Sequence, residues 1–154
     1  MSYTFEYGKQ FAIEFDNFPE DQQDAILDFL FTYQEYGLNN FSKYQGKITP
    51  SWRGIDKTDP IYDLTYSKSL WHYHVGLPEY QKSKYNNYLT SDMILHFQWK
   101  SNSTHIKVLD ITWHYKSNGE FWLPSSQNLE YKTVIKERAM RNLDIIQVRV
   151  ETCS

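Results

Sequence analysis

The chain has 154 residues, a formal net charge of −3 and a single cysteine, Cys153. One cysteine excludes an intramolecular disulfide and a cysteine-based zinc site, and the length is that of one globular domain. The acidic balance argues against a strongly basic nucleic-acid-binding protein, and no apolar run has the length of a membrane span or a signal peptide. We expect one soluble, cytoplasmic domain over residues 1–154, with a core at about 3–123 and a C-terminal helical extension at about 125–154.

Acidic and aromatic side chains stand out in the composition. Residues 1–30 hold seven carboxylates against one lysine, a net charge of −6, so the other 124 residues sum to +3. This division allows an acidic helix face and a mildly positive face elsewhere. With 13 Tyr, 9 Phe and 5 Trp, a domain of this size must expose several rings. Exposed rings among lysines suit stacking on bases, and they suit sugars or a protein partner equally well.

Three segments make up the N-terminal part of the chain. Residues 3–15 contain an alternation of side chains that predicts a strand. A helix is predicted at about 19–36, because Pro19 suits a first turn, acidic residues follow it, and Gly37 can end the helix. Residues 38–60 show no period and contain two glycines and two prolines, so we expect loop and turn there.

Strands dominate the prediction for the middle of the chain. Segments rich in Tyr, Trp, Ile and Val predict strands at about 61–66, 69–75, 93–99 and 105–115. The last of these carries apolar side chains on both faces, which is typical of a central strand buried on both sides. A polar loop rich in Lys, Tyr and Asn separates the second of these strands from the third.

The C-terminal part predicts a basic amphipathic helix at about 127–142, with Ser125 and Ser126 as candidate caps, and a short strand at 145–150. A strand, a helix, a run of strands with hairpin-length connections and a final helix indicate an α+β fold. We expect an antiparallel sheet with the N-terminal helix packed on one face and an added C-terminal helix.

All five histidines lie in the predicted strands, and four of them can share one face of the sheet. Because side chains alternate along a strand, His72 and His74 in LWHYHVG project from one face, which we expect to be open. Their aromatic and apolar neighbours project from the other face, which we expect to be buried. If the three strands are neighbours, His96 and His114 converge with this pair on one patch.

The residues alone leave three interpretations of these histidines open. The first is a metal site, but H-x-H is a weak signal and the strands offer no obvious carboxylate apart from Asp110. The second is a set of half-buried polar residues satisfied by strand neighbours. The third, which we favour, is a cluster that transfers protons or contacts a phosphate, because histidine titrates near neutral pH. We therefore expect no metal and no cofactor.

The surroundings of the histidines suit an RNA substrate. The loop that leaves the H-x-H strand combines lysines for phosphates with tyrosines for unstacked bases, although it is equally typical of a solvated connection. The candidate RNA-binding residues are Arg53, Lys82, Lys84, Tyr85, Tyr88 and Lys116.

Four motifs, in their order along the chain, resemble the YafO-type toxins of bacterial type II toxin–antitoxin systems, within the RelE-like group. They are AILDFLFTYQEYG, WHYHVGLP, TSDMILHF and HIKVLDITWHYK, and the resemblance covers about residues 20–123. It implies a small α+β fold with an antiparallel sheet and ribosome-dependent cleavage of messenger RNA, which inhibits translation. It also implies a cognate antitoxin as partner, and neither a membrane nor direct DNA contact.

The resemblance extends to individual residues of a metal-independent endoribonuclease. His72 and His74 stand where the group has a basic pair, and the candidate catalytic residues are His72, His74, His96, His114 and Tyr115. His72 or His74 would take a proton, His114 would donate one, and Lys116 or Lys84 would hold the phosphate. The chain departs from the group in its acidic charge and its single arginine before residue 138. A non-catalytic aromatic-rich binding module and a histidine-ligated metalloenzyme remain as alternatives.

Overall fold

The computed structural model describes residues 2–82, 88–126 and 128. The helices in these residues are α1 (Lys9–Glu14), α2 (Glu20–Tyr36) and α3 (Pro60–Ser67), with short 3-10 turns η1 (Phe15–Asn17) and η2 (Phe41–Lys43). The strands are β1 (Thr4–Tyr7), β2 (Ile48–Pro50), β3 (Leu70–His74), β4 (Gln81–Lys82), β5 (Leu89–Thr90), β6 (Met93–Gln98) and β7 (His105–Trp113).

A five-stranded mixed sheet in the order β1-β7-β6-β3-β2 organises this α+β fold, and β4 and β5 form a small second sheet. The expectation of a wholly antiparallel sheet is wrong at one edge, because β1 pairs with β7 in parallel, with Thr4 opposite His105. The chain leaves β1 through α1 and α2 before it returns to the sheet, and such a helical connection permits parallel pairing. The other pairs are antiparallel.

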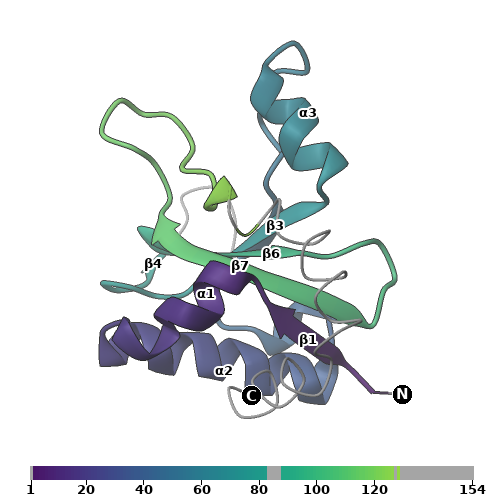
Figure 1. The fold of residues 1–154 in the computed structure, drawn as a ribbon, viewed down its shortest axis with the longest axis vertical. Helices are drawn as coiled ribbons and strands as arrows, with labels where there is room; N and C mark the ends of the chain where they lie inside the picture. Colours follow the sequence, from purple (N-terminus) through teal and green to yellow (C-terminus); the bar gives the residue numbers. More distant parts are fainter. Residues whose placement is uncertain (1, 83–87, 127, 129–154) are drawn as a thin grey trace.

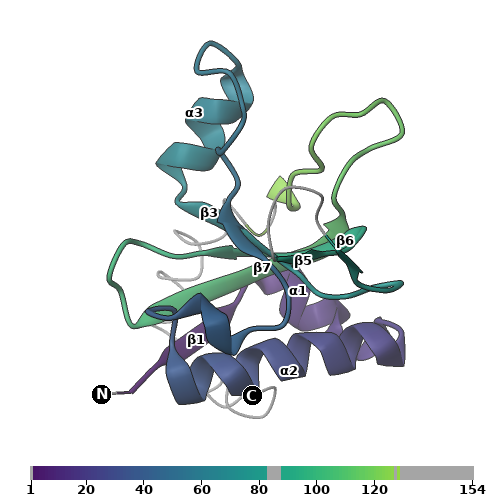
Figure 2. The same cartoon turned by 180° about the vertical axis from the view of Figure 1, so that it is seen from behind.

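Helices lie on both sides of the sheet. Figure 1 shows α1 and α2 below it, with α3 and the hairpin that follows β7 rising above it, and Figure 2 shows the same arrangement from behind. The predicted helix at 19–36 is confirmed as α2, which Pro19 precedes and which Gly37 ends with a positive φ of 65°. The sheet therefore has one face covered by α2 and a second face that α3 and the hairpin flank.

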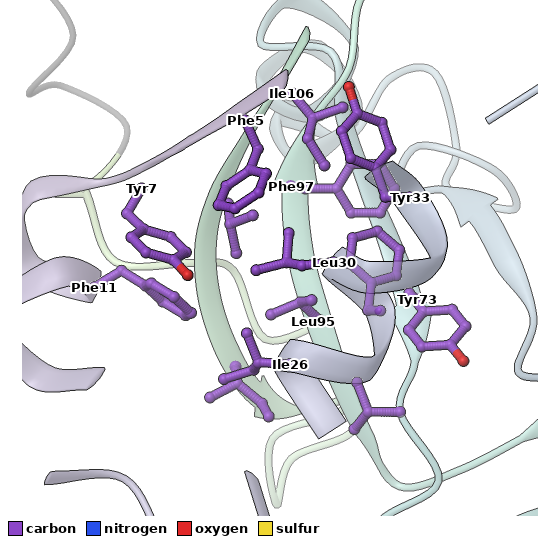
Figure 3. Packing of buried hydrophobic residues seen from close by; sticks show 14 of the residues in the cluster. Phe5, Tyr7, Phe11, Ile26, Leu30, Tyr33, Tyr73, Leu95, Phe97 and Ile106 are labelled. Atoms are coloured by element: carbon purple, nitrogen blue, oxygen red, sulfur yellow. The ribbon is translucent and has the colours of Figure 1, made fainter. Parts of the chain in front are cut away.

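The hydrophobic core fills the space between α2 and the sheet. In Figure 3, Ile26, Leu30 and Tyr33 of α2 lie against Leu95 and Phe97 of β6. The aromatic side of β3 faces this core through Tyr73, as the alternation predicts. The predicted strands at 69–75, 93–99 and 105–115 are confirmed as β3, β6 and β7, and β7 is central, with buried residues on both faces.

The predicted strand at 3–15 is wrong beyond Tyr7, because residues 9–14 form α1. Phe11 and Phe15 are four residues apart and both are buried, whereas Ile13 between them is 53% exposed. A spacing of four places both phenylalanines on one side of a helical turn. The alternation of apolar side chains over the five residues 11–15 is therefore compatible with a strand and with a helix.

The predicted strand at 61–66 is also wrong, because these residues belong to α3. The helix begins where Oδ1 of Asp59 accepts a hydrogen bond from the Ile61 N–H at 2.9 Å and Pro60 takes the first helical position. Tyr66 of this helix packs on Trp52, with ring centroids 5.3 Å apart. This contact links α3 to the turn after β2, in which Arg53 lies.

The segment 38–60, expected to be loop, contains β2, which pairs with β3 at the sheet edge. An edge strand of three residues that ends in proline is too short to show a period. The predicted helix at 127–142 and strand at 145–150 lie outside the described residues, as does the extension at 125–154 apart from residues 125, 126 and 128. No helix in the described part of the chain is long and apolar enough to cross a membrane.

Replacing Asp59 with alanine is expected to destabilise the protein by about 0.5–2 kcal/mol, the usual contribution of an N-cap side chain. The substitution leaves the Ile61 N–H without its partner at the start of α3. Urea denaturation measures the change. Asp59→Asn, which retains a capping oxygen, should stay within a few tenths of a kcal/mol of the unaltered protein, and equal losses for both variants would contradict the capping role.

Candidate active site

Neighbouring strands bring the predicted histidines to one face of the sheet. His72 of β3 lies directly opposite His96 of β6, and β6 in turn pairs with β7. His114 follows the end of β7, where its N–H donates to the Asp92 carbonyl at 2.7 Å. This face is turned away from α2, because the side chains that alternate with the histidines form the core.

Three of these histidines form a cluster, which we call the histidine triad. The ring centroids of His72 and His74 are 5.5 Å apart, and those of His114 lie 5.1 Å from His72 and 5.0 Å from His74. One ring nitrogen from each residue lies within 4.8 Å of the other two. The triad therefore combines two imidazoles of β3 with one from the residue that follows β7, and β6 lies between these two strands in the sheet.

The expectation of an open histidine face is wrong. His72 and His74 are 4% and 3% exposed. A hairpin after β7, closed by a bridge between Tyr115 and Phe121, folds back over this face. The Phe121 ring packs 5.4 Å from His72 and 5.8 Å from His114, between centroids, and so excludes water from one side of the triad.

His96 is separate from the triad. It is fully buried, its Nε2 lies 2.8 Å from the Thr112 hydroxyl, and its Nδ1 has no hydrogen-bond partner among the described residues. Its ring packs against Phe121 with centroids 5.7 Å apart. His96 therefore supports the floor of the site and does not reach the cavity that the triad lines. Asp110, the one carboxylate that the sequence indicated, accepts from the Ser125 N–H.

Hydrogen bonds fix the rings of His72 and His74 through Nδ1. His72 Nδ1 lies 2.9 Å from the Ser51 hydroxyl, and His74 Nδ1 lies 2.8 Å from the Ser91 carbonyl oxygen and 3.1 Å from the Ser91 nitrogen. A carbonyl oxygen only accepts, so we assign the His74 proton to Nδ1 from the shorter contact. The lone pair of His74 is then on Nε2, the nitrogen left for the triad.

Burial is the main reason that these imidazoles are neutral at pH 7. It lowers the pKa of His114 to about 4, with further lowering by His74 and Lys47. Burial and then the neighbouring histidines lower the pKa of His72 well below its ordinary value. The pKa of His74 is lowered by burial and by Lys47, against the opposing hydrogen bond to Ser91. Neutral rings can accept a proton or bind a metal, whereas His114 cannot act as an acid at pH 7 until something raises its pKa.

A cavity of about 570 Å³ opens beside the triad. Its wall combines two cationic side chains, Lys47 and Arg53, with two aromatic ones, Trp113 and Tyr115. The other lining residues are mostly small or polar, and they are Thr49, Pro50, Gln81, Thr90, Ser91 and Asp92. The cavity therefore places positive charge and exposed rings next to three neutral imidazoles.

The structure brings some of the predicted site residues together and separates others. His72, His74, His114, Tyr115 and Arg53 line the cavity. Lys82, Tyr88 and Lys116 are exposed and are not part of its wall. Lys84 and Tyr85 lie outside the described residues.

Sequence reasoning missed several residues that build the site. Lys47, Ser51 and Ser91 come from segments without a clear period, and nothing in the sequence connects them with the histidines. Phe121 had a usable signal, since Asn118 and Gly119 form the Asn-Gly pair that favours a tight hairpin, and Gly119 has a φ of 88°. That signal predicts a hairpin that folds back beside His114.

Comparisons with known proteins give no relative for this arrangement. No family model matches the chain, and neither a curated protein nor a solved structure matches it. The assignment of function therefore depends on the geometry of the cavity and on the motifs in the sequence.

The protein should lose stability as the pH falls below about 6.5, in part because of His96. Burial lowers the pKa of His96 to about 3, while the unfolded chain takes the proton near the ordinary value of 6.5. Between these values only the unfolded state is protonated, so the stabilisation present above pH 6.5 is lost on acidification, by up to about 1.4 kcal/mol per pH unit. Urea denaturation between pH 7.5 and 5 measures this slope.

His96→Gln should reduce that slope, because glutamine does not titrate. Thr112→Val is the matched control, since it removes the hydrogen-bond partner of His96 without removing the titrating group. Thr112→Val should be less stable at every pH and keep the slope of the unaltered protein. An unchanged slope in His96→Gln would show that other groups control the acid sensitivity.

Proposed function

We propose that this protein is an endoribonuclease that cleaves messenger RNA, in the manner of the YafO-type and RelE-like toxins its motifs resemble, with the cavity beside the histidine triad as its active site. The observation that carries the proposal is the composition of this cavity. Neutral imidazoles that can move a proton, cations that can hold a phosphate and rings that can stack on a base line one space of about 570 Å³.

The residues of the cavity wall suit a single-stranded, anionic substrate. Lys47 and Arg53 offer positive charge to a phosphodiester, and Trp113 and Tyr115 are exposed aromatic residues suited to unstacked bases. A second cavity, of about 610 Å³ beside α2, is lined by Asp21, Asp24 and Asp28 among others. Its carboxylates would repel a phosphate, so the charge distribution favours the triad cavity as the RNA site.

The chemical step follows from the free nitrogens of the triad. Nε2 of His74 takes the proton of a ribose 2′-OH, and the 2′-oxygen attacks phosphorus as the bond between phosphorus and the 5′-oxygen breaks. The products are a 2′,3′-cyclic phosphate and a 5′-hydroxyl. The 5′-oxygen receives its proton from His114, whose pKa rises when the phosphate enters, because an anion next to an imidazole favours its charged form. Lys47 and Arg53 stabilise the charge that develops on the phosphate.

Docking on the ribosome would explain how a protein with a net charge of −3 acts on RNA. If the ribosome positions the messenger, the enzyme needs fewer cations of its own to hold it. A cognate antitoxin would act by covering the cavity, whose wall includes the exposed rings of Trp113 and Tyr115. Large exposed rings of this kind are typical of a protein interaction surface.

Expression of the unaltered protein in a bacterial host is expected to arrest growth and to leave messenger RNA fragments with 2′,3′-cyclic phosphate ends. His114→Ala should relieve the arrest and remove the fragments, because it removes the proton donor at the cavity. His105→Ala is the control, since His105 is an exposed histidine at the other end of β7. Equal arrest by His114→Ala would exclude catalysis by the triad, and RNA binding without new ends would support a binding module.

A further inference from the structure

The nitrogen atoms of the histidine triad lie almost as close together as the ligand atoms of a metal site. Three ring nitrogens lie within 4.8 Å of one another. Bonds of about 2.0–2.1 Å from zinc to nitrogen in a tetrahedral site place ligand nitrogens roughly 3.4 Å apart. No hydrogen bond to the described residues holds the His114 ring, so a rotation of this ring can supply the difference. Hydrogen bonds at Nδ1 hold the rings of His72 and His74 in place.

The hydrogen bonds at Nδ1 are those that orient metal-binding histidines. A ligating imidazole usually donates its second N–H to a carbonyl or another acceptor, which fixes the tautomer and aims the lone pair. The Ser91 carbonyl oxygen lies 2.8 Å from Nδ1 of His74, and the Ser51 hydroxyl lies 2.9 Å from Nδ1 of His72. Ser51 and Ser91 are themselves buried, at 3% and 4% exposure, so these supports are part of the fold.

The donor set selects the class of ion. Three imidazole nitrogens without a thiolate suit zinc and its neighbours in the first transition series, whereas magnesium and calcium require oxygen ligands. The fourth position of a tetrahedral ion would face the cavity, which is large enough for water or a substrate group. A site with three protein ligands and one open position is typical of exchangeable or reactive zinc.

We propose that His72, His74 and His114 bind one zinc ion, and that zinc bound there suppresses the RNA cleavage proposed above. The binding stands independently of the proposed function, whereas the suppression rests on it. Zinc would occupy the Nε2 lone pair that takes the 2′-OH proton, so one imidazole cannot serve both purposes. The triad would then be a site at which zinc regulates the enzyme.

Zinc binding is tested on the untagged full chain, stripped with a chelator and titrated with ZnCl₂ against a chromophoric competitor. We expect one zinc per chain, and the absorption of tetrahedral cobalt when CoCl₂ is used instead. His114→Gln is the informative variant, because His114 is only partly buried and lies beyond the end of β7. It should weaken zinc binding at least 100-fold, and Ser51→Ala, which loosens His72, should weaken it about 10–100-fold.

The matched control is His105→Gln, which removes a histidine outside the triad and should bind zinc as the unaltered protein does. Near-UV circular dichroism checks that each variant is folded. Equal zinc affinity in His114→Gln and in the unaltered protein would overturn the proposed site. Loss of zinc in His105→Gln with retention in His114→Gln would overturn it as well.

The regulatory role is tested by RNA cleavage in a translation reaction with chelator-treated protein. We expect cleavage without added metal, suppression by one equivalent of ZnCl₂, and no suppression by the same amount of MgCl₂. Cleavage that requires zinc would overturn the suppression while leaving the binding site in place. Stoichiometric zinc binding with no cleavage in either state would overturn both the suppression and the proposed function, but not the site.

Discussion

Replacement of His74 by glutamine is expected to slow RNA cleavage by about 10²–10⁴-fold, the usual contribution of a general base. The Ser91 carbonyl holds the His74 ring through Nδ1, so the lone pair of Nε2 is left for the substrate. The partner in this contact is a backbone atom. Glutamine retains a donor for that carbonyl and a comparable size, but it cannot take a proton near neutral pH. Cleavage of a defined messenger in a translation reaction, followed as single turnovers, measures the rate.

Two comparisons make the result specific. His105→Gln should cleave at the unaltered rate, since His105 contacts Thr4 and Glu6 at the far end of β7. In His74→Gln, kcat should fall while KM changes little, because the lost interaction belongs to the transition state. A higher KM with unchanged kcat would assign His74 to substrate binding, and equal rates for the two variants would remove it from the mechanism.

The parts of the fold that the sequence predicted well are those with long or repeated signals. Helix α2 combines an acidic start at Glu20, apolar side chains at helical spacing and a glycine stop at Gly37. Strands β3, β6 and β7 are rich in aromatic and β-branched residues. Errors occurred in α1, α3 and β2, where each element is short and its tertiary contacts decide the conformation. In α3 the Asp59-Pro60 start was present in the sequence, but the Tyr and Ile content outweighed it.

The site was predictable to the extent that strand alternation determines it. The spacing of His72 and His74 placed them on one face, and the pairing of β3, β6 and β7 brought His114 to them. Alternation could not predict the burial of that face, because the cover is Phe121, which arrives through a hairpin. It also could not separate His96 from the triad, since the difference depends on where one ring finds the Thr112 hydroxyl.

The two faces of the sheet have different roles, one in stability and the other in the proposed chemistry. One face holds the aromatic core against α2, and substitutions there should act on folding. The other face holds histidines that burial keeps neutral and hydrogen bonds orient. Because the unfolded chain takes up protons at these histidines more readily, the folded state loses stability as the pH falls. Asp21, Asp24 and Asp28 belong to α2 and lie away from the triad cavity, whose described wall sets Lys47 and Arg53 against one carboxylate, that of Asp92.

Removal of the Lys47 charge is expected to lower kcat/KM for RNA cleavage by about 10²–10³-fold, the range found when one group that stabilises developing charge is lost. Lys47 lines the triad cavity, and its charge is close enough to lower the pKa of both His74 and His114. Its position is fixed by the backbone, because the His74 N–H donates to the Lys47 carbonyl at 3.0 Å. Lys47→Met keeps that backbone contact and most of the side-chain length.

Lys43→Met is the matched control for Lys47→Met. Lys43 lies four residues earlier and is exposed, and its Nζ is 4.9 Å from the Tyr36 ring centroid, beside α2 and outside the triad cavity. Both variants remove one positive charge, so a general effect of net charge on RNA attraction would slow them equally. Urea midpoints should be similar for the two proteins. If Lys43→Met loses as much activity as Lys47→Met, long-range attraction holds the RNA and the triad cavity is not where the scissile phosphate lies.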